Sequence, residues 1–422
     1  MIRIVDFACF LERNRISFVT PAGCQCGRFG ESYAPSNDQD AGNLNSVAQF
    51  RSDVPQATID DLHRRLDLTR FPERETVADR SQGVPLALMA DLKEYWRHHY
   101  DWRRCEDQLN ALGQWKTAID GLDVHFLHIR SPHEYALPLL LTHGWPGSIV
   151  EFLKVIGPLT RPQDYGGSAD DAFHLVIPSL PGYGFSGKPQ EPGWGVNRIA
   201  QAWLELMRRL GYSRFVAQGG DWGAAVTTAI GGLGAPECIG IHLNMPLAFP
   251  DAEDLASPGP EGERALARLA HYDQVEIGYA KLQGTRPQTL GYALADSPIG
   301  QAAWILEKFW AWSDSGEDLW TAFSRDEVLD NIMLYWLGNS AASSGRLYWE
   351  SLGSAFQQHR TRVPTGCSIF PAEIFAPPRR WVEKQYPGLV YWSEPDRGGH
   401  FAAMEQPALF ASEIRQCCRL WR

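Results

Sequence analysis

One stretch of the chain places an acidic side chain where a nucleophile would stand. Residues 214–228 read RFVAQGGDWGAAVTT: a short apolar run, then GGDWG, then small residues that can open a helix. This is the small-x-nucleophile-x-small pattern of a sharp strand-to-helix turn, with Asp221 in the nucleophile position. Glycines suit such a turn because its strand and helix backbones come too close for side chains. The alternative interpretation is that Asp221 caps the helix in an ordinary glycine-rich turn.

An aspartate in this position predicts attack on an alkyl carbon instead of serine-type chemistry. No G-x-S-x-G segment occurs in the 422 residues. A carboxyl group with a reference pKa of about 3.9 is already ionised at neutral pH, so it needs no base to become a nucleophile. Attack by Asp221 would displace a leaving group and form an ester on its own side chain.

A histidine and an acidic residue late in the chain can complete a catalytic triad. In this architecture the order along the chain is nucleophile, acid, histidine. His400 stands in the glycine-rich segment RGGHF after the last apolar run, which makes it the predicted base. Glu373 follows the run before it, in the segment PAE, and is the predicted acid that orients His400. Asp251, after an earlier run, is the alternative, whereas Asp396 is too close in sequence to His400 to orient it.

Two further glycine-rich segments follow apolar runs. HGWPGS at residues 143–148 can aim a backbone N–H at the nucleophile, and with the N–H of Trp222 it would form an oxyanion hole. His143 itself is expected to support this loop. GYGFSG at residues 182–187 matches G-x-G-x-x-G, but the segment KPQEPG after it cannot open a helix. A dinucleotide is therefore not expected, and no other cofactor is predicted.

The elements that must position these groups alternate from about residue 109 onward. Short apolar runs bounded by glycine and proline are separated by helical stretches, which is typical of the α/β class with a mostly parallel sheet and helices on both faces. The runs cover residues 124–129, 136–142, 173–179, 214–218, 239–244, 365–370 and 389–393. Asp221, Glu373 and His400 each follow one of them.

Helical and strongly aromatic sequence interrupts this pattern between about residues 248 and 353. An insertion at this point predicts a cap over the active site. Tyr279 and Tyr348 lie in it, and a phenol with a reference pKa of about 10 can donate a proton to a developing alkoxide. The alternative for either tyrosine is a packing role. Core positions are expected for the tryptophans of this region, Trp304, Trp310, Trp312 and Trp320.

The remaining sequence completes the predicted domain organisation. Residues 1–45 are a polar, turn-rich flexible lead, and residues 46–108 are a small helical domain with helices expected at 55–68, capped by Thr58, and at 86–100. The α/β core is divided by the cap. Its first part covers residues 109–247, the cap covers 248–353, and the second part of the core covers 354–422.

Composition limits the partners and the compartment. The net charge is −11 and no long basic run occurs, which argues against a nucleic-acid partner. The eight cysteines are scattered without paired metal-ligand spacing, so no metal site is predicted and a reducing, cytoplasmic compartment is expected. The apolar runs are far shorter than the ~20 residues of a transmembrane helix, and residues 1–11 match neither an anchor nor a signal peptide.

Seven segments, in order and correctly spaced over residues 47–416, resemble the microsomal-type epoxide hydrolases. They are DLHRRLDLTRFP, HGWPGS, PSLPGYGFS, GGDWG, LADSPIGQAAWILEKF, PTGCSIFPAE and RGGHFAAMEQP. The resemblance implies an α/β-hydrolase fold with an eight-stranded sheet and a helical N-terminal domain. It implies Asp221 as nucleophile, His400 as base with Glu373 as its acid, and Tyr279 and Tyr348 as ring-opening acids. The polar lead departs from the membrane-anchored members, so a soluble protein is expected.

The expected reaction opens an epoxide with water to give a vicinal diol through an ester on Asp221. The N–H groups of Trp145 and Trp222 would hold the oxyanion during ester hydrolysis, and a histidine pKa near 6.5 suits that step. The expected partners are water and an apolar epoxide of small-molecule size. The aromatic residues of the cap favour a bulky epoxide within this class. A possible homodimer stays open.

Two other functions remain as alternatives. The first is a haloalkane dehalogenase of the same fold, in which Trp222 would donate to the halide; the tyrosine pair argues against it because a halide leaves without a proton. The second is a non-catalytic ligand receptor on a hydrolase scaffold. An intact set of Asp221, Glu373 and His400 argues against that function.

Overall fold

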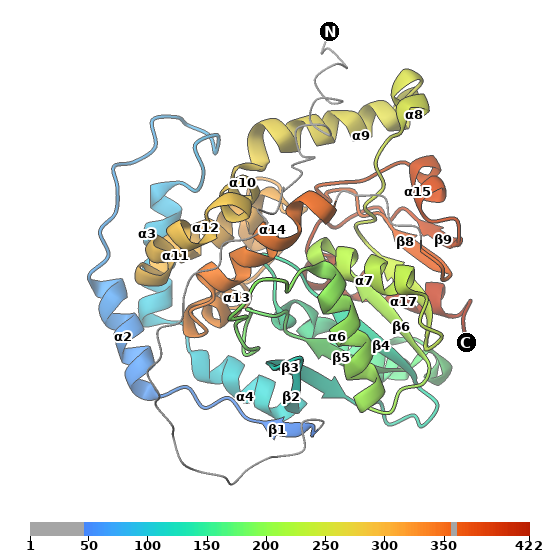
Figure 1. Cartoon of the computed structure of the whole chain (residues 1–422). Coiled ribbons are helices and arrows are strands. Elements are labelled where there is room, and N and C mark those ends of the chain that lie inside the picture. Colours follow the sequence, from blue (N-terminus) through green and yellow to red (C-terminus); the bar gives the residue numbers. More distant parts are fainter. Residues whose placement is uncertain (1–45, 356–360) are drawn as a thin grey trace, which may run out of the picture.

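One nine-stranded sheet organises the computed structural model, which describes residues 46–355 and 361–422 (Figure 1). The strand order is β1-β2-β3-β5-β4-β6-β7-β8-β9. The strands from β5 to β9 in this order pair in parallel, while β1, β2 and β3 form an antiparallel edge that joins β5. The predicted α/β class with a mostly parallel sheet is confirmed. The predicted flexible lead, residues 1–45, lies outside the described residues.

All seven predicted runs are strands. They are β3 (Leu122–Ile129), β4 (Leu137–Thr142), β5 (Phe173–Pro178), β6 (Phe215–Gly219), β7 (Cys238–Leu243), β8 (Thr365–Ser368) and β9 (Leu389–Ser393). The strands at the centre of the sheet are almost continuously buried. Near-continuous apolar sequence is what strands covered on both faces require.

The predicted number of eight strands is wrong, because the described residues form nine. The two strands without a predicted run are β1 (Ala48–Phe50) and β2 (Gln114–Ile119) at the antiparallel edge. β2 reads QWKTAI, whose polar residues hide it from a search for apolar runs. It forms a hairpin with β3 through Asp120 and Gly121, both with positive φ, at 50° and 76°. An Asp-Gly pair is the sequence signal for such a turn.

Helices flank the sheet between the strands. They are α5 (Ile156–Thr160), α6 (Val196–Arg209), α7 (Asp221–Leu233), α15 (Arg379–Gln385), α16 (Ala402–Glu405) and α17 (Pro407–Cys418). Successive residues of a strand point to opposite faces. On β7, Ile241 packs against Gly231 of α7. The next residue, His242, points to the other face together with its pairing partner Gly366 of β8, and Gly366 packs against Cys417 of α17. The two helices therefore lie on opposite faces, as predicted.

The helices between β7 and β8 occupy the predicted cap region. They are α8 (Ala252–Ala256), α9 (Gly259–His271), α10 (Gly278–Thr285), α11 (Pro287–Asp296), α12 (Pro298–Ala311), α13 (Arg325–Leu337) and α14 (Ala341–Ala355). In Figure 1 they gather, in yellow and orange, above and to the left of the sheet. Because they leave from the end of β7, they start at the carboxyl edge of the parallel strands, where the loops after β4, β6, β8 and β9 also lie.

Three helices precede the core: α2 (Gln56–Asp67), α3 (Leu86–His98) and α4 (Trp102–Leu112). The first two match the predicted helices, but the predicted N-cap at Thr58 is wrong because α2 begins two residues earlier, with Pro55 in the capping position. No helix was predicted at α4. Its start was readable, since Asp101 accepts a hydrogen bond from the N–H of Arg103 as an N-cap should.

These N-terminal helices brace the cap. Arg104 of α4 pairs with Asp330 of α13 at 2.6 Å, and the hydroxyl of Tyr100 donates to the same carboxylate at 2.8 Å. The Asp330 side chain is only 5% exposed, so the ion pair is shielded from solvent on one side. The N-terminal region therefore fixes α13, the helix that holds one of the loops of the site described next.

Candidate active site

Asp221 is held in a strained turn at the end of β6. Its φ is +50°, a left-handed conformation that non-glycine residues seldom adopt. The turn is crowded: a Cβ on Gly223 would lie 1.9 Å from the carbonyl oxygen of Thr142, and one on Gly144 would lie 2.1 Å from Oδ1 of Asp221. Glycine is therefore required both in the turn itself and in the loop that faces it, which explains the glycines of the segments GGDWG and HGW.

Two backbone N–H groups point at the Asp221 carboxylate. The N–H of Trp145 donates to Oδ1 at 2.8 Å, and the N–H of Trp222 is the second donor. The loop with Trp145 is fastened from the cap, because Asn331 of α13 donates to the carbonyl of Pro146 at 2.7 Å and Tyr335 donates to that of Gly147 at 2.8 Å. The sequence contained no local signal for these two supports, which contact the loop only through the tertiary fold.

His400 lies between the two predicted carboxylates. Its Nδ1 is 2.6 Å from Oε1 of Glu373, and its Nε2 is 3.6 Å from Oδ2 of Asp221. Glu373 also accepts the N–H of Ile374 at 2.8 Å on the same oxygen. The loops that carry the acid and the histidine are joined, since the N–H of Ala372 donates to the carbonyl of Gly398 at 3.1 Å. The structure thus brings the three predicted residues together with the geometry of a triad.

The electrostatics of the triad differ from the expectation of an ordinary histidine. Burial works against the imidazolium, but the adjacent Glu373 and Asp221 carboxylates outweigh it and raise the pKa of His400 to about 9. Burial also raises the pKa of Asp221, opposed by His400 and by the two N–H donors. At neutral pH the His400 side chain of the free site is therefore an imidazolium, and the predicted pKa near 6.5 is wrong for this state.

The cap also holds the histidine loop. The N–H of His400 donates to the carbonyl of Trp312, at the end of α12, at 2.8 Å, and the N–H of Gly398 donates to Asp314 at 2.9 Å. Trp312 is buried, as expected, with its ring centroid 5.0 Å from that of His400. Trp312 and Asp314 were not predicted to serve the site, and only their position after α12 relates them to it.

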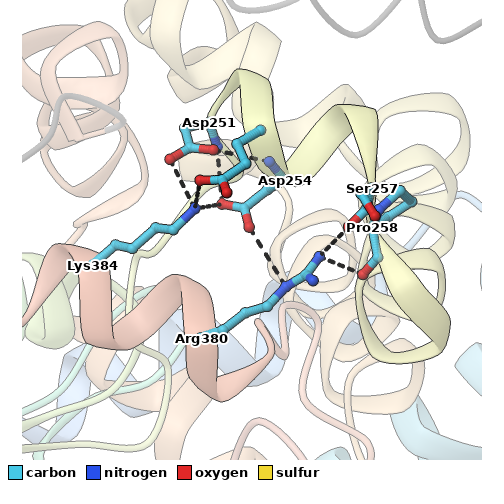
Figure 2. Close-up of polar contacts among 7 residues, drawn as sticks. Asp251, Asp254, Ser257, Pro258, Arg380 and Lys384 are labelled. Atoms are coloured by element: carbon cyan, nitrogen blue, oxygen red, sulfur yellow. Dashed lines mark hydrogen bonds and ion pairs between the residues drawn. The ribbon is translucent and has the colours of Figure 1, made fainter.

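Asp251, the alternative acid, lies in a separate cluster of charges that joins the start of the cap to α15 (Figure 2). Its carboxylate caps α8 and pairs with Lys384 at 2.9 Å, while Arg380 approaches Asp254 at 3.5 Å. The N–H of Asp254 and then the Lys384 ammonium lower the pKa of Asp251 to about 2. The structure places Glu373, and not Asp251, against His400.

Tyr279 and Tyr348 line the same cavity as the nucleophile, and each ring packs against one of the tryptophans that supply the N–H donors. The Tyr279 ring stacks on Trp145 with centroids 4.7 Å apart, and the Tyr348 ring meets Trp222 edge-on at 4.8 Å. Burial raises the pKa of both phenols well above 10, so both are protonated at neutral pH. No hydrogen bond of normal geometry joins the buried Tyr348 hydroxyl to a described residue, although the Tyr279 phenol is near enough to affect the pKa of Tyr348. Both phenols can therefore serve as donors.

A cavity of about 90 Å³ joins these groups. Asp221, Tyr279 and Tyr348 line it, and the rest of the wall is largely apolar: Trp222, Ala225, Met245, Leu247, Phe249, Leu269, Tyr272, Leu352, Ile374 and Phe375. The core contributes the nucleophile and the cap contributes the phenols. A ligand here would meet a carboxylate from the core and proton donors from the cap, within an otherwise apolar wall.

The two remaining motifs have structural contacts. His143 donates from Nδ1 to the carbonyl of Gly144 and accepts the N–H of Leu180 at Nε2, and burial lowers its pKa to about 4. The GYGFSG loop is followed by no helix before α6. It packs on the start of α14, where Ser343 donates to the carbonyl of Gly182 at 2.6 Å. This contact supports the helix that carries Tyr348.

Within residues 46–355 and 361–422, no group of three or more His, Cys, Asp or Glu side chains is arranged to hold a metal ion. None of the helices in the same ranges has the length and apolar character needed to cross a membrane.

Comparison with known proteins identifies the family. The model of the epoxide hydrolase N terminus matches residues 47–152, and that of the alpha/beta hydrolase fold matches residues 138–266. Epoxide hydrolase 1 of Oryctolagus cuniculus is 38% identical over 87% of this chain and 88% of its own length. The crystal structure of juvenile hormone epoxide hydrolase from the silkworm Bombyx mori aligns with a TM-score of 0.83 and 32% identity, over 89% of this chain and 95% of that one.

The structure of Aspergillus niger epoxide hydrolase agrees with this result. It aligns with a TM-score of 0.79 and 31% identity, over 89% of this chain and 96% of that one. A covalent mechanism is general for these enzymes. The chain belongs to the microsomal-type epoxide hydrolase family and is an epoxide hydrolase with an α/β-hydrolase fold.

Proposed function

We propose that this enzyme hydrolyses an apolar epoxide in two steps, with Asp221 as nucleophile, Tyr279 and Tyr348 as acids, and His400 oriented by Glu373 as base. The observation that carries the proposal is the placement of Asp221 and both phenols in the wall of one cavity, with the His400–Glu373 pair directly behind the nucleophile. An epoxide needs groups of these two kinds on opposite sides, because one carbon is attacked while the oxygen on it leaves.

In the first step the Asp221 carboxylate attacks a ring carbon and the C–O bond breaks. The electron pair of that bond stays on the oxygen, which takes a proton from a phenol. The products are a hydroxyalkyl ester on Asp221 and a phenolate. Since attack is from the side away from the leaving oxygen, the attacked carbon is inverted.

The second step needs a neutral His400, although the free site holds an imidazolium. Esterification removes the charge of Asp221, one of the carboxylates that raise the pKa of His400. The imidazolium can then give up its proton, which replaces the one lost by the phenol. Neutral His400 takes a proton from water, the resulting hydroxide attacks the ester carbonyl, and the N–H groups of Trp145 and Trp222 hold the oxyanion. The tetrahedral intermediate then expels the alkoxide as the ester C–O bond breaks, and the alkoxide takes the proton of the new Asp221 carboxyl group. The diol, the Asp221 carboxylate and the imidazolium formed on proton uptake from water result.

The proposed proton route predicts how the pKa of the His400 imidazole depends on its neighbouring carboxylates. In the wild type, NMR of the imidazole should show a pKa near 9. Asp221→Asn imitates the uncharged ester and should lower that pKa, because one stabilising carboxylate is gone. Glu373→Gln should lower it too, and should slow ester hydrolysis by orders of magnitude, as expected when the acid of a triad is neutralised.

The matched control for this titration is Asp251→Asn. Its carboxylate pairs with Lys384 and its side chain is 41% exposed, so its loss should leave the His400 pKa and turnover unchanged. A His400 pKa that falls with Asp251→Asn and stays constant with Glu373→Gln would reverse the assignment of the acid. A pKa unaffected by Asp221→Asn would contradict the proton route from His400.

The cavity wall supports an apolar substrate. Leu247, Phe249, Leu269 and Phe375 offer no hydrogen-bonding side chains to a ligand, and burial of apolar surface favours binding by about 25 cal/mol per Å². Incubation with styrene oxide should yield the vicinal diol, while a halobutane should release no halide above the buffer control. Halide release without diol formation would contradict the proposed chemistry.

A further inference from the structure

A third tyrosine lines the cavity and contacts one of the two proposed acids. Tyr272 is partly buried and shares the cavity wall with Asp221, Tyr279 and Tyr348. Its hydroxyl oxygen lies 3.0 Å from that of Tyr279, and either oxygen can be the donor. The cavity thus contains a hydrogen-bonded pair of phenols beside the single phenol of Tyr348.

The backbone around Tyr272 departs from regular helix. Residues Tyr272–Glu276 form a turn of π-helix between α9 and α10, closed by a 2.8 Å bond from the N–H of Ile277 to the carbonyl of Tyr272. Turns of π-helix are rare in proteins overall, and those that occur are often found at functional sites. This one lies directly between the helix that ends before Tyr272 and the helix that carries Tyr279, so its geometry sets how the two phenols meet.

A buried cation fixes the other end of the π-helical turn. The Lys308 ammonium pairs with the Glu276 carboxylate at 2.9 Å, and the Lys308 side chain is 5% exposed. It also lies 5.1 Å from the centroid of the Tyr279 ring. A positive charge over an aromatic face is attractive, and it becomes more so if the ring gains negative charge. Lys308 also pairs with Glu307 at 2.7 Å, and its ammonium lies on the Tyr279 ring against burial and the nearby Asp221 carboxylate, which raise the pKa of that phenol.

We infer that Tyr272 is a positioning residue for ring opening, which donates its hydroxyl hydrogen to Tyr279 while Tyr279 donates to the epoxide oxygen. Hydroxyl hydrogens rotate freely, so the pair can adopt this direction when substrate is bound. As the epoxide C–O bond breaks and the proton moves from Tyr279 to the oxygen, negative charge grows on the Tyr279 phenol. A hydrogen bond to a charged acceptor is stronger than one to a neutral acceptor, so Tyr272 stabilises the transition state more than the ground state.

The inference rests on the proposed role of Tyr279 and predicts an effect confined to the first step. Tyr272→Phe keeps the ring and removes only the hydroxyl. We expect alkylation of Asp221, followed by tryptophan fluorescence in single turnovers, to slow by about tenfold or more. Hydrolysis of the ester should be unchanged, because that step uses His400. Tyr292→Phe, on α11 with the residue 70% exposed, is the matched control and should behave as wild type.

Double variants that combine Tyr272→Phe with a change at Tyr279 or Tyr348 distinguish a positioning role of Tyr272 from a packing role. Tyr272→Phe should have no further effect on alkylation in a Tyr279→Phe background, where its acceptor is gone, and should keep its full effect in a Tyr348→Phe background. A packing role would slow alkylation equally in both. Tyr272→Leu serves as a second variant without the hydroxyl, with thermal unfolding of each variant as the check on folding.

Two outcomes would overturn the inference in distinguishable ways. Wild-type alkylation by folded Tyr272→Phe, or an equal slowing in the Tyr279→Phe background, would overturn the positioning role while leaving Tyr279 as an acid. Wild-type alkylation by Tyr279→Phe itself would instead remove the proposed acid, and the role of Tyr272 with it.

Discussion

Replacement of His400 by glutamine should give an enzyme that alkylates itself once and then stops. Asp221 needs no base for its attack, since it is already a carboxylate, whereas the second step needs His400 to take a proton from water. The ester on Asp221 should therefore accumulate. Mass spectrometry of the intact protein should show a gain equal to the mass of the epoxide. Asp221→Ala should show neither the adduct nor turnover.

The distances in the site explain why the two variants should differ. Nε2 of His400 lies 3.6 Å from Oδ2 of Asp221, close enough to serve a water that attacks the ester without bonding tightly to the nucleophile. His98→Gln is a suitable control, because this α3 side chain is 52% exposed and should leave both steps intact. Absence of an adduct on folded His400→Gln protein, under single-turnover conditions, would contradict the two-step scheme.

The second large effect is expected from the cap phenols. The oxygen that leaves an epoxide is a strong base as an alkoxide, so donation of a proton must accompany C–O cleavage. Loss of one hydrogen bond to an oxygen that develops charge typically raises the barrier by about 2.7–4 kcal/mol. Tyr279→Phe and Tyr348→Phe should each slow alkylation markedly and leave some activity. The double variant should be nearly inactive.

The step affected distinguishes this effect from general damage to the site. Stopped-flow tryptophan fluorescence can follow both steps, because Trp145 stacks on Tyr279 and Trp222 contacts Tyr348. Ester hydrolysis should continue at nearly the wild-type rate in both single variants, since it depends on His400 and the N–H groups of Trp145 and Trp222. If both single variants alkylate at the wild-type rate, the phenols are packing residues and the leaving group needs no proton from them.

Much of the site could be predicted because its requirements are local. The turn at Asp221 demands glycines within two residues on either side, since a Cβ on Gly223 would lie 1.9 Å from a backbone oxygen. The central strands are buried on both faces, so each is a short apolar run that any window of sequence reveals. Glu373 and His400 follow such runs, and the order along the chain assigned them. Their contact at 2.6 Å is found in the structure, while their catalytic roles stay predictions until tested.

Other features depended on long-range contacts that no window of sequence contains. The edge strand β1 is mostly exposed, and its neighbour β2 is only partly buried although it pairs with both β1 and β3, so both sequences are partly polar and only pairing reveals the strands. The sequence favoured Glu373 but left Asp251 as an alternative, and only the fold shows that Asp251 pairs with Lys384 while Glu373 contacts His400. The raised pKa of His400 comes from acidic side chains that the fold gathers around it, chiefly Glu373 and then Asp221 and Glu151.

The sequence by itself determined the family, the α/β sheet and the residues with reactive side chains, because glycine sterics and apolar periodicity are properties of neighbouring residues. Only the tertiary structure decided how the cap serves the site. The Asn331 side chain holds the loop of Trp145 by donating to a backbone carbonyl, and the backbone carbonyl of Trp312 holds the loop of His400. Because each contact uses a backbone carbonyl, no pair of side-chain types in the sequence reveals it. Tyr272 meets Tyr279 only because a π-helical turn joins their helices. Such contacts arise from packing, which fixes distances between groups whatever their separation along the chain.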